Sequence, residues 1–148
     1  MKLVFFNAIP LAAALASTVA LTLESNAAGV VITVSGIAQA DGQIGCSLFK
    51  SALGFPMDSS AARQVWLPAS RDGVVCSFSE VSEGRYAVAV AHDLNGNRRV
   101  DTNFVGIPTE AWGVSGNARP TLRSPRWDEA FFEVGREKDV ALEIRVAK

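Results

Sequence analysis

Short runs of β-branched and aromatic residues recur about every ten positions from residue 30 onward in this 148-residue chain, with turn-forming residues between them. Within each run the apolar side chains occupy every second position, as in Val30, Ile32 and Val34. That spacing is typical of a strand with one buried face, and no stretch keeps a 3.6-residue period over three helical turns. The pattern predicts an all-β fold, a sandwich of about seven antiparallel strands.

The alternating runs also predict where the strands lie. They are Val30–Val34, Ile44–Leu48, Val65–Leu67, Val74–Phe78, Tyr86–Val90, Ala130–Val134 and Val140–Val146. Phe104–Val114 alternates poorly and contains glycine and proline, so we expect it to be an extended loop. The alanines at 87, 89 and 91 form a small-residue face that could lie close to neighbouring backbone.

The N-terminus has the pattern of an export signal. Lys2 precedes a largely apolar stretch, and small residues at Ser25 and Ala27 create a cleavage site after residue 27. The alternative is an uncleaved membrane anchor, because the apolar stretch is about as long as a bilayer requires. We expect cleavage, which divides the chain into a signal peptide (1–27) and one sandwich domain (28–148). The product would be periplasmic or extracellular, with no stable transmembrane segment.

Charge restricts the possible partners. The formal net charge is −1, and removing residues 1–27 takes away one Lys and one Glu, so the balance stays the same. A nucleic-acid-binding domain needs a basic surface, which this composition does not supply. We therefore expect no nucleic-acid partner, and an envelope or extracellular ligand whose identity the sequence does not reveal.

Two cysteines, Cys46 and Cys76, lie in the predicted domain. An even cysteine count in an exported protein indicates a disulfide. Each cysteine also falls in the inward phase of its predicted strand, so a bridge between two core-facing strands is plausible. Zinc is a poor alternative, because two cysteines and one distant histidine do not complete a tetrahedral site.

A cluster of short oxygen-bearing side chains follows the run Tyr86–Val90. Counting from Asp93 as position 1, Asn95, Asn97 and Asp101 fall at positions 3, 5 and 9. This spacing matches the front part of an EF-hand calcium loop, in which the backbone carbonyl at position 7 also binds the ion. Position 7 is Arg99, and we expect its carbonyl to complete that part of a structural calcium site.

The loop departs from the EF-hand pattern at two positions. Arg98 occupies position 6, which is usually glycine, and Phe104 occupies position 12, which is usually a bidentate glutamate. Glu110 could fold back and supply the missing carboxylate. The low ligand charge and neighbouring arginines predict weak affinity, with a Kd on the order of 10⁻⁴–10⁻³ M. The alternative is a metal-free turn, because Asn95-Gly96 is a favoured type I′ hairpin signal.

The segment Gly84–Ser115 resembles a known bacterial family. It reads G-x-Y-A-V-A-V-A-H-D-x-N-G-N and then D-T-N-F-x-G-I-P-x-E-x-W-G-x-S. This string is similar to the secreted proteins grouped as domain of unknown function 2141, and looser similarity extends over about Val30–Val146. Arg98 stands where that family usually has glycine. The resemblance implies a small exported β-sandwich, similar to prealbumin or immunoglobulin modules, and implies no activity.

His92, the chain's single histidine, is the obvious candidate for catalysis. It shares the phase of Val88 and Val90, and a lone histidine there is more often a structural residue at a strand end. One histidine does not build a Ser-His-acid set with any clear partners. The enzymatic alternative is a carbohydrate-active hydrolase that uses His92, Asp93 and Glu110, which would require these three groups to meet in a pocket.

Three tryptophans provide a further alternative. A glycan-binding module would need two of Trp66, Trp112 and Trp127 to be exposed and coplanar, whereas ordinary packing would bury them. Our leading hypothesis is a non-enzymatic exported β-sandwich module, stabilised by calcium, that serves as a binding or accessory domain at the cell envelope.

Overall fold

Eight β-strands in two sheets form the framework of residues 27–148, the part of the chain that the computed structural model describes. Residues 1–26 of the predicted signal lie outside the described residues. The strands are β1 (Ala28–Ser35), β2 (Gln43–Phe49), β3 (Arg63–Pro68), β4 (Val74–Val81), β5 (Gly84–Asp93), β6 (Trp112–Val114), β7 (Phe132–Val134) and β8 (Val140–Arg145). The helical segments are short: η1 (Ser59–Ala61), η2 (Ser115–Asn117) and α1 (Trp127–Ala130). The predicted all-β class is confirmed.

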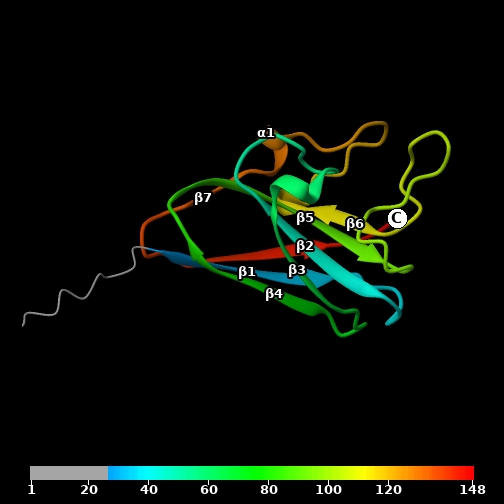
Figure 1. Cartoon of the computed structure of the whole chain (residues 1–148), viewed down its shortest axis with the longest axis horizontal. Helices are drawn as coiled ribbons and strands as arrows, with labels where there is room; N and C mark the ends of the chain where they lie inside the picture. Colours follow the sequence, from blue (N-terminus) through cyan, green and yellow to red (C-terminus); the bar gives the residue numbers. More distant parts are fainter. Residues whose placement is uncertain (1–26) are drawn as a thin grey trace, which may run out of the picture.

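The two sheets face one another as a sandwich (Figure 1). One has the strand order β4-β1-β8, and the other has the order β3-β2-β5-β6, with β7 paired to the start of β5. The prediction of a purely antiparallel fold was wrong at one place, because β1 and β8 run parallel. A parallel pair needs a long crossover connection, and here the whole second sheet lies between the two strands in sequence.

The predicted alternation places the core between the sheets. Val30, Ile32 and Val34 of β1 are fully buried, whereas Val31 and Thr33 between them are exposed. On β8, Ile144 is also fully buried. The period-2 pattern therefore identified the inward face correctly, and burial of these branched side chains supplies the main driving force for the fold.

The predicted disulfide between Cys46 and Cys76 is present. Cys46 lies on β2 and Cys76 on β4, so the bridge joins the five-stranded sheet to the three-stranded sheet. Both cysteines are fully buried within the core. The disulfide is therefore a covalent tie through the centre of the sandwich.

The small-residue face of β5 is covered from outside the sandwich. Ala87 is fully buried and forms a second apolar cluster with Val114 and Ala130. Ser115 links these pieces, because its hydroxyl accepts the Val88 N–H (2.9 Å) and donates to the Ala130 carbonyl (2.6 Å). The expectation that small side chains permit a close approach is confirmed.

Two predicted boundaries were wrong. Ala130 ends α1, and the strand begins only at Phe132, because the Glu129 side chain caps the start of a helical turn at Arg126. Trp112–Val114, expected to be loop, is β6. Gly113 permits this, since a Cβ there would lie 2.6 Å from the Arg145 carbonyl oxygen, and β6 approaches the end of β8 through the Trp112–Ala147 bridge.

The helices found in residues 27–148 are all brief. None of them has the length and apolar character needed to cross a bilayer.

Candidate functional site

The polar loop, residues 93–101, begins where β5 ends. β5 pairs with β2 as far as Asp93, opposite Gln43, so the framework holds the first residue of the loop rigidly. The chain then makes an excursion before returning as β6 beside the same strand. The loop is therefore positioned by two strands that the sandwich core supports.

Asp93 is the centre of the polar loop. Its side chain is fully buried, and its Oδ1 accepts the N–H groups of Asn95 (3.2 Å) and Gly96 (2.8 Å). Its Oδ2 accepts the N–H of Arg98 (2.7 Å). A buried carboxylate is costly unless polar partners surround it, and these three amides provide that surrounding.

Asp101 closes the polar loop from the other side. Its two carboxylate oxygens accept the side-chain amides of Asn95 (2.5 Å) and Asn97 (2.7 Å). The Oδ1 of Asn95 accepts the Asn97 N–H (3.1 Å), and the Oδ1 of Asn97 accepts the Arg99 N–H (2.9 Å). The four side chains at positions 1, 3, 5 and 9 therefore belong to one hydrogen-bonded network.

Glu110 joins this network although it lies far along the chain. It is buried, and its two oxygens accept the N–H groups of Leu94 (2.8 Å) and Asp101 (3.0 Å). One carboxylate thus holds both ends of the polar loop. The suggestion that Glu110 folds back toward the loop is borne out by these contacts.

The backbone of the polar loop follows a calcium-type turn more closely than a hairpin. Arg98 has a φ of 58°, the left-handed conformation that the glycine at position 6 usually serves. Gly96 also has a positive φ of 79°, but Asn95 does not. A type I′ turn needs positive φ at both central residues, so the Asn95-Gly96 hairpin alternative does not form.

The polar loop does not hold a ready carboxylate cage. Within residues 27–148, no three side chains of the His, Cys, Asp and Glu types converge closely enough to hold a metal ion. In the described conformation Asp93 and Glu110 face backbone amides, and Asp101 faces the two asparagine amides. Arg99 is exposed. Any ion would have to replace some of these amide donors.

His92 is buried directly before the polar loop, and its side chain takes no part in the loop's hydrogen bonds among the described residues. It is 2% exposed, and its Nε2 lies 2.8 Å from the carbonyl oxygen of Asp41. That contact ties the end of β5 to the connection before β2. The histidine has the position of a structural residue at a strand end.

The three tryptophans are half-buried on three different elements, and each has its own packing partner. The Trp66 ring lies over Gly45, and Trp127 makes an edge contact with Phe55. Arg119 covers the Trp112 ring, with its Cζ 4.6 Å from the ring centroid. This arrangement does not favour a shared stacking platform for sugars.

An apolar groove beside the polar loop was missed by the sequence analysis. It has a volume of about 710 Å³ and lies between the apolar hairpin, residues 102–108, and the return loop, residues 118–125. β5 and β6 form its floor. Figure 1 shows both loops projecting from the same end of the sandwich. The available signal was an apolar run, Phe104-Val105-Gly106-Ile107, within a polar stretch.

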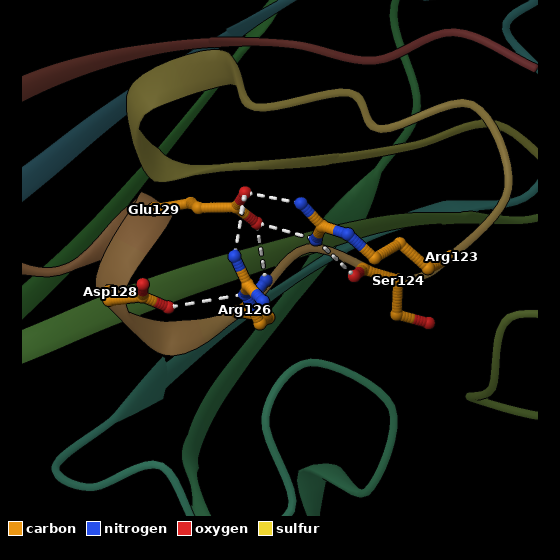
Figure 2. A network of polar contacts seen from close by, with 5 residues as sticks. All are labelled: Arg123, Ser124, Arg126, Asp128 and Glu129. Carbon is orange, nitrogen blue, oxygen red and sulfur yellow. Dashed lines mark hydrogen bonds and ion pairs between the residues drawn. The ribbon is translucent and has the colours of Figure 1, made fainter.

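The return loop is anchored by an ion-pair network (Figure 2). Arg123 donates two hydrogen bonds to the Glu129 carboxylate (2.8 and 2.5 Å), and the Arg126 N–H donates a third (2.8 Å). These donors hold the pKa of Glu129 at about 2, chiefly through Arg123. Arg126 also lies 3.6 Å from Asp128. Arg123 and Arg126 are therefore paired with the acidic residues that follow them in the chain.

The fold and loop define an all-β sandwich with a buried-carboxylate loop at one end and a groove beside it. The chain belongs to the family described as "Uncharacterized protein conserved in bacteria (DUF2141)", whose model matches residues 32–142. The predicted family is confirmed. Comparison with curated proteins and with solved structures gave no match.

Proposed function

We propose that this chain is an exported, non-enzymatic β-sandwich module that acts as a binding or accessory domain at the cell envelope. Its polar loop holds a weakly bound structural calcium ion. The oxygen ligands are those of Asp93, Asn95, Asn97 and Asp101, with the Arg99 carbonyl and Glu110 completing the set.

The observation that carries the calcium proposal is a cluster of three carboxylates that amides solvate but no cation pairs. Asp93, Asp101 and Glu110 belong to one hydrogen-bonded network, and in the described residues none of them lies within ion-pair distance of a Lys or Arg side chain. Asp93 and Glu110 are also buried. Buried carboxylates are usually paired with a cation or bind a metal, so a hard divalent ion would offset their repulsion.

The left-handed Arg98 supports the same proposal. Arg98 occupies position 6, where calcium loops usually have glycine, and it adopts the left-handed backbone conformation of that sharp turn. The amide nitrogens of Asn95 and Asn97 face Asp101 as donors. Rotation of these amides would turn their oxygens toward Asp101 and away from the N–H groups of Asn97 and Arg99, so an ion between them would replace four hydrogen bonds.

The non-enzymatic part of the proposal rests on His92. A general base must reach a substrate proton, but this imidazole is buried and held against the Asp41 carbonyl. A His92→Gln variant should leave any ligand binding within a few-fold of the parent chain. Loss of turnover of a substrate in a folded His92→Gln variant would contradict the proposal.

Export is supported by the predicted signal at residues 1–27 and by the disulfide, which is typical of oxidising compartments. N-terminal sequencing of the protein from the envelope fraction should find a start at Ala28 or Gly29. Membrane-bound protein that begins at Met1 would argue for the uncleaved anchor.

Thermal unfolding in millimolar calcium and in chelator tests the ion. Because the ion binds the folded state preferentially, tenfold excess over Kd should raise the free energy of unfolding by about 1.4 kcal/mol. Magnesium should substitute poorly, since it requires a tight octahedron and dehydrates reluctantly. An unchanged melting temperature together with no binding heat in calorimetry would show that the loop is metal-free.

A further inference from the structure

Large apolar side chains protrude from the end of the molecule that carries the groove. Phe104 at the tip of the apolar hairpin is 100% exposed, and Leu122 in the return loop is 97% exposed. Val105 and Ile107 are also more than half exposed, and both line the groove together with Leu122. Single exposed apolar residues are common, but a protruding group on two loops that flank one groove marks an interaction surface.

The apolar hairpin bonds much of its own backbone through Asn103. Asn103 accepts the N–H groups of Val105 (3.1 Å) and Ile107 (3.0 Å) on its side-chain oxygen. Its carbonyl accepts the Gly106 N–H (2.9 Å), and its own N–H donates to the Ile107 carbonyl (2.9 Å). These four bonds reduce the number of amides that the tip would leave unpaired on leaving water, which favours its entry into the headgroup boundary of a lipid phase.

The charges that line the groove are basic. Among the described residues, its lining includes Arg119, Arg123 and Lys148 and contains no Asp or Glu side chain. Glu129 neutralises Arg123. Arg119 instead donates to the carbonyls of Trp112 and Ala147, and neither it nor Lys148 makes an ion pair within residues 27–148. Arg119 therefore keeps an unpaired positive charge although two carbonyls hold its side chain, and Lys148 is a second cation at the groove without an ionic partner among the described residues.

We infer that this end of the molecule docks on an anionic phospholipid surface. Phe104 and Leu122 insert among the acyl chains at the headgroup boundary, while Arg119 and Lys148 face the lipid phosphates. A fluid surface accommodates two separate protrusions, whereas a protein partner would need two matching pockets. The inference goes beyond the proposed calcium site and does not require it, because Asn103 closes the hairpin without an ion.

Vesicle sedimentation tests the inference with the processed, exported protein. Vesicles of phosphatidylglycerol mixed with phosphatidylcholine are compared with vesicles of phosphatidylcholine alone. Excess chelator is present throughout, so calcium cannot bridge the carboxylates of the polar loop to lipid phosphates. We expect binding that depends on phosphatidylglycerol. Failure of the calcium proposal would leave this result unchanged, so the two proposals fail separately.

Serine variants identify the inserting residues. Phe104→Ser and Leu122→Ser should each lower the vesicle partition coefficient about tenfold, because each removes an inserted apolar side chain. Lys148→Gln should lower it about fivefold on the anionic vesicles only. Val75→Ser is the matched control, since Val75 is 56% exposed on β4, outside the groove. It should bind as the parent chain does.

Folding failure is not expected in these variants, because Phe104 and Leu122 are almost fully exposed. Unchanged melting temperatures would verify this. The inference is overturned if the protein does not sediment with anionic vesicles, if it binds phosphatidylcholine alone equally well, or if Phe104→Ser and Leu122→Ser bind like Val75→Ser.

Discussion

The apolar side chains of the sandwich core and the Asp93 side chain of the polar loop are equally buried, but they are stabilised in different ways. Ile32 and Ile144 are fully buried among other apolar groups, and no polar atom in these side chains needs a partner. Asp93 is just as inaccessible, yet its carboxylate depends on three directed hydrogen bonds from the loop backbone. Core stability should therefore depend on side-chain volume and on the disulfide. Stability of the polar loop should depend on its charged side chains and on its backbone conformation.

A second contrast concerns what each region leaves exposed. The sandwich faces its branched side chains inward, and the disulfide joins the sheets at their centre. At the end of the molecule that carries the polar loop and the groove, Phe104 and Leu122 are exposed to solvent, whereas the carboxylates of Asp93 and Glu110 are buried. If the loops serve the proposed docking, stability and recognition are separated in space, because rigid sheets carry loops whose surface is free to vary.

The largest effect should come from removing the disulfide. A Cys46→Ala/Cys76→Ala variant should lose about 3–4 kcal/mol of unfolding free energy, because the bridge closes a loop with a sequence separation of 30. Chemical denaturation measures the loss. Reductant should destabilise the parent chain similarly and leave the variant unaffected. A parent chain that is insensitive to reductant would show that the core does not rely on the bridge.

Replacement of Asp93 should have the next largest effect. Asp93→Ala leaves the N–H groups of Asn95, Gly96 and Arg98 without their acceptor, and we expect a loss of about 2–3 kcal/mol. The same variant should lose any stabilisation by calcium. Asp72→Ala is the control, because Asp72 is exposed in a turn. Equal melting temperatures for the two variants would remove the proposed distinction between loop and core.

A glycine at position 98 should stabilise the protein. Arg98 has a φ of 58°, which costs a residue with a side chain about 1 kcal/mol relative to glycine. Arg98→Gly should recover most of that amount and strengthen calcium binding, because it also removes a nearby positive charge. Arg99→Gly is the matched control, since Arg99 does not have a positive φ. Destabilisation by Arg98→Gly would indicate that the arginine side chain, which lies over Trp66, matters more than the backbone.

The smallest effect concerns acid. The pKa of Glu129 is held at about 2, below its ordinary 4.5, first by the Arg123 hydrogen bonds. A depressed pKa stabilises the folded form above pH 4.5, and that stabilisation is lost as the pH falls from 4.5 toward 2. The return loop should become more sensitive to an acid-active protease over this range. Glu129→Gln should be sensitive already at neutral pH, and a pH-independent parent chain would contradict the assignment.

Local pattern was sufficient for much of the sandwich. Alternation along β1, β4 and β8 predicted the buried faces, because side chains on a strand point to opposite sides of the sheet in turn. The same phase placed Cys46 and Cys76 inward, and they meet. The spacing of the polar residues from Asp93 to Asp101 predicted a polar loop at this position, because the geometry of a turn is set by residues that are neighbours in the sequence.

Long-range contacts decided the rest. Whether β8 would lie parallel to β1, and whether Trp112 would join a strand edge, depends on the partner that each segment finds. Alternation states which face of a strand is buried and constrains its register, but it does not specify which strand becomes its partner. Glu110 reaches the loop, and two loops separated in sequence enclose a groove, because the sheets bring them to one end. The sequence by itself determined the buried strand faces, the disulfide and the position of the polar loop. The tertiary structure determined the strand pairing, the contact of Glu110 with the loop and the groove.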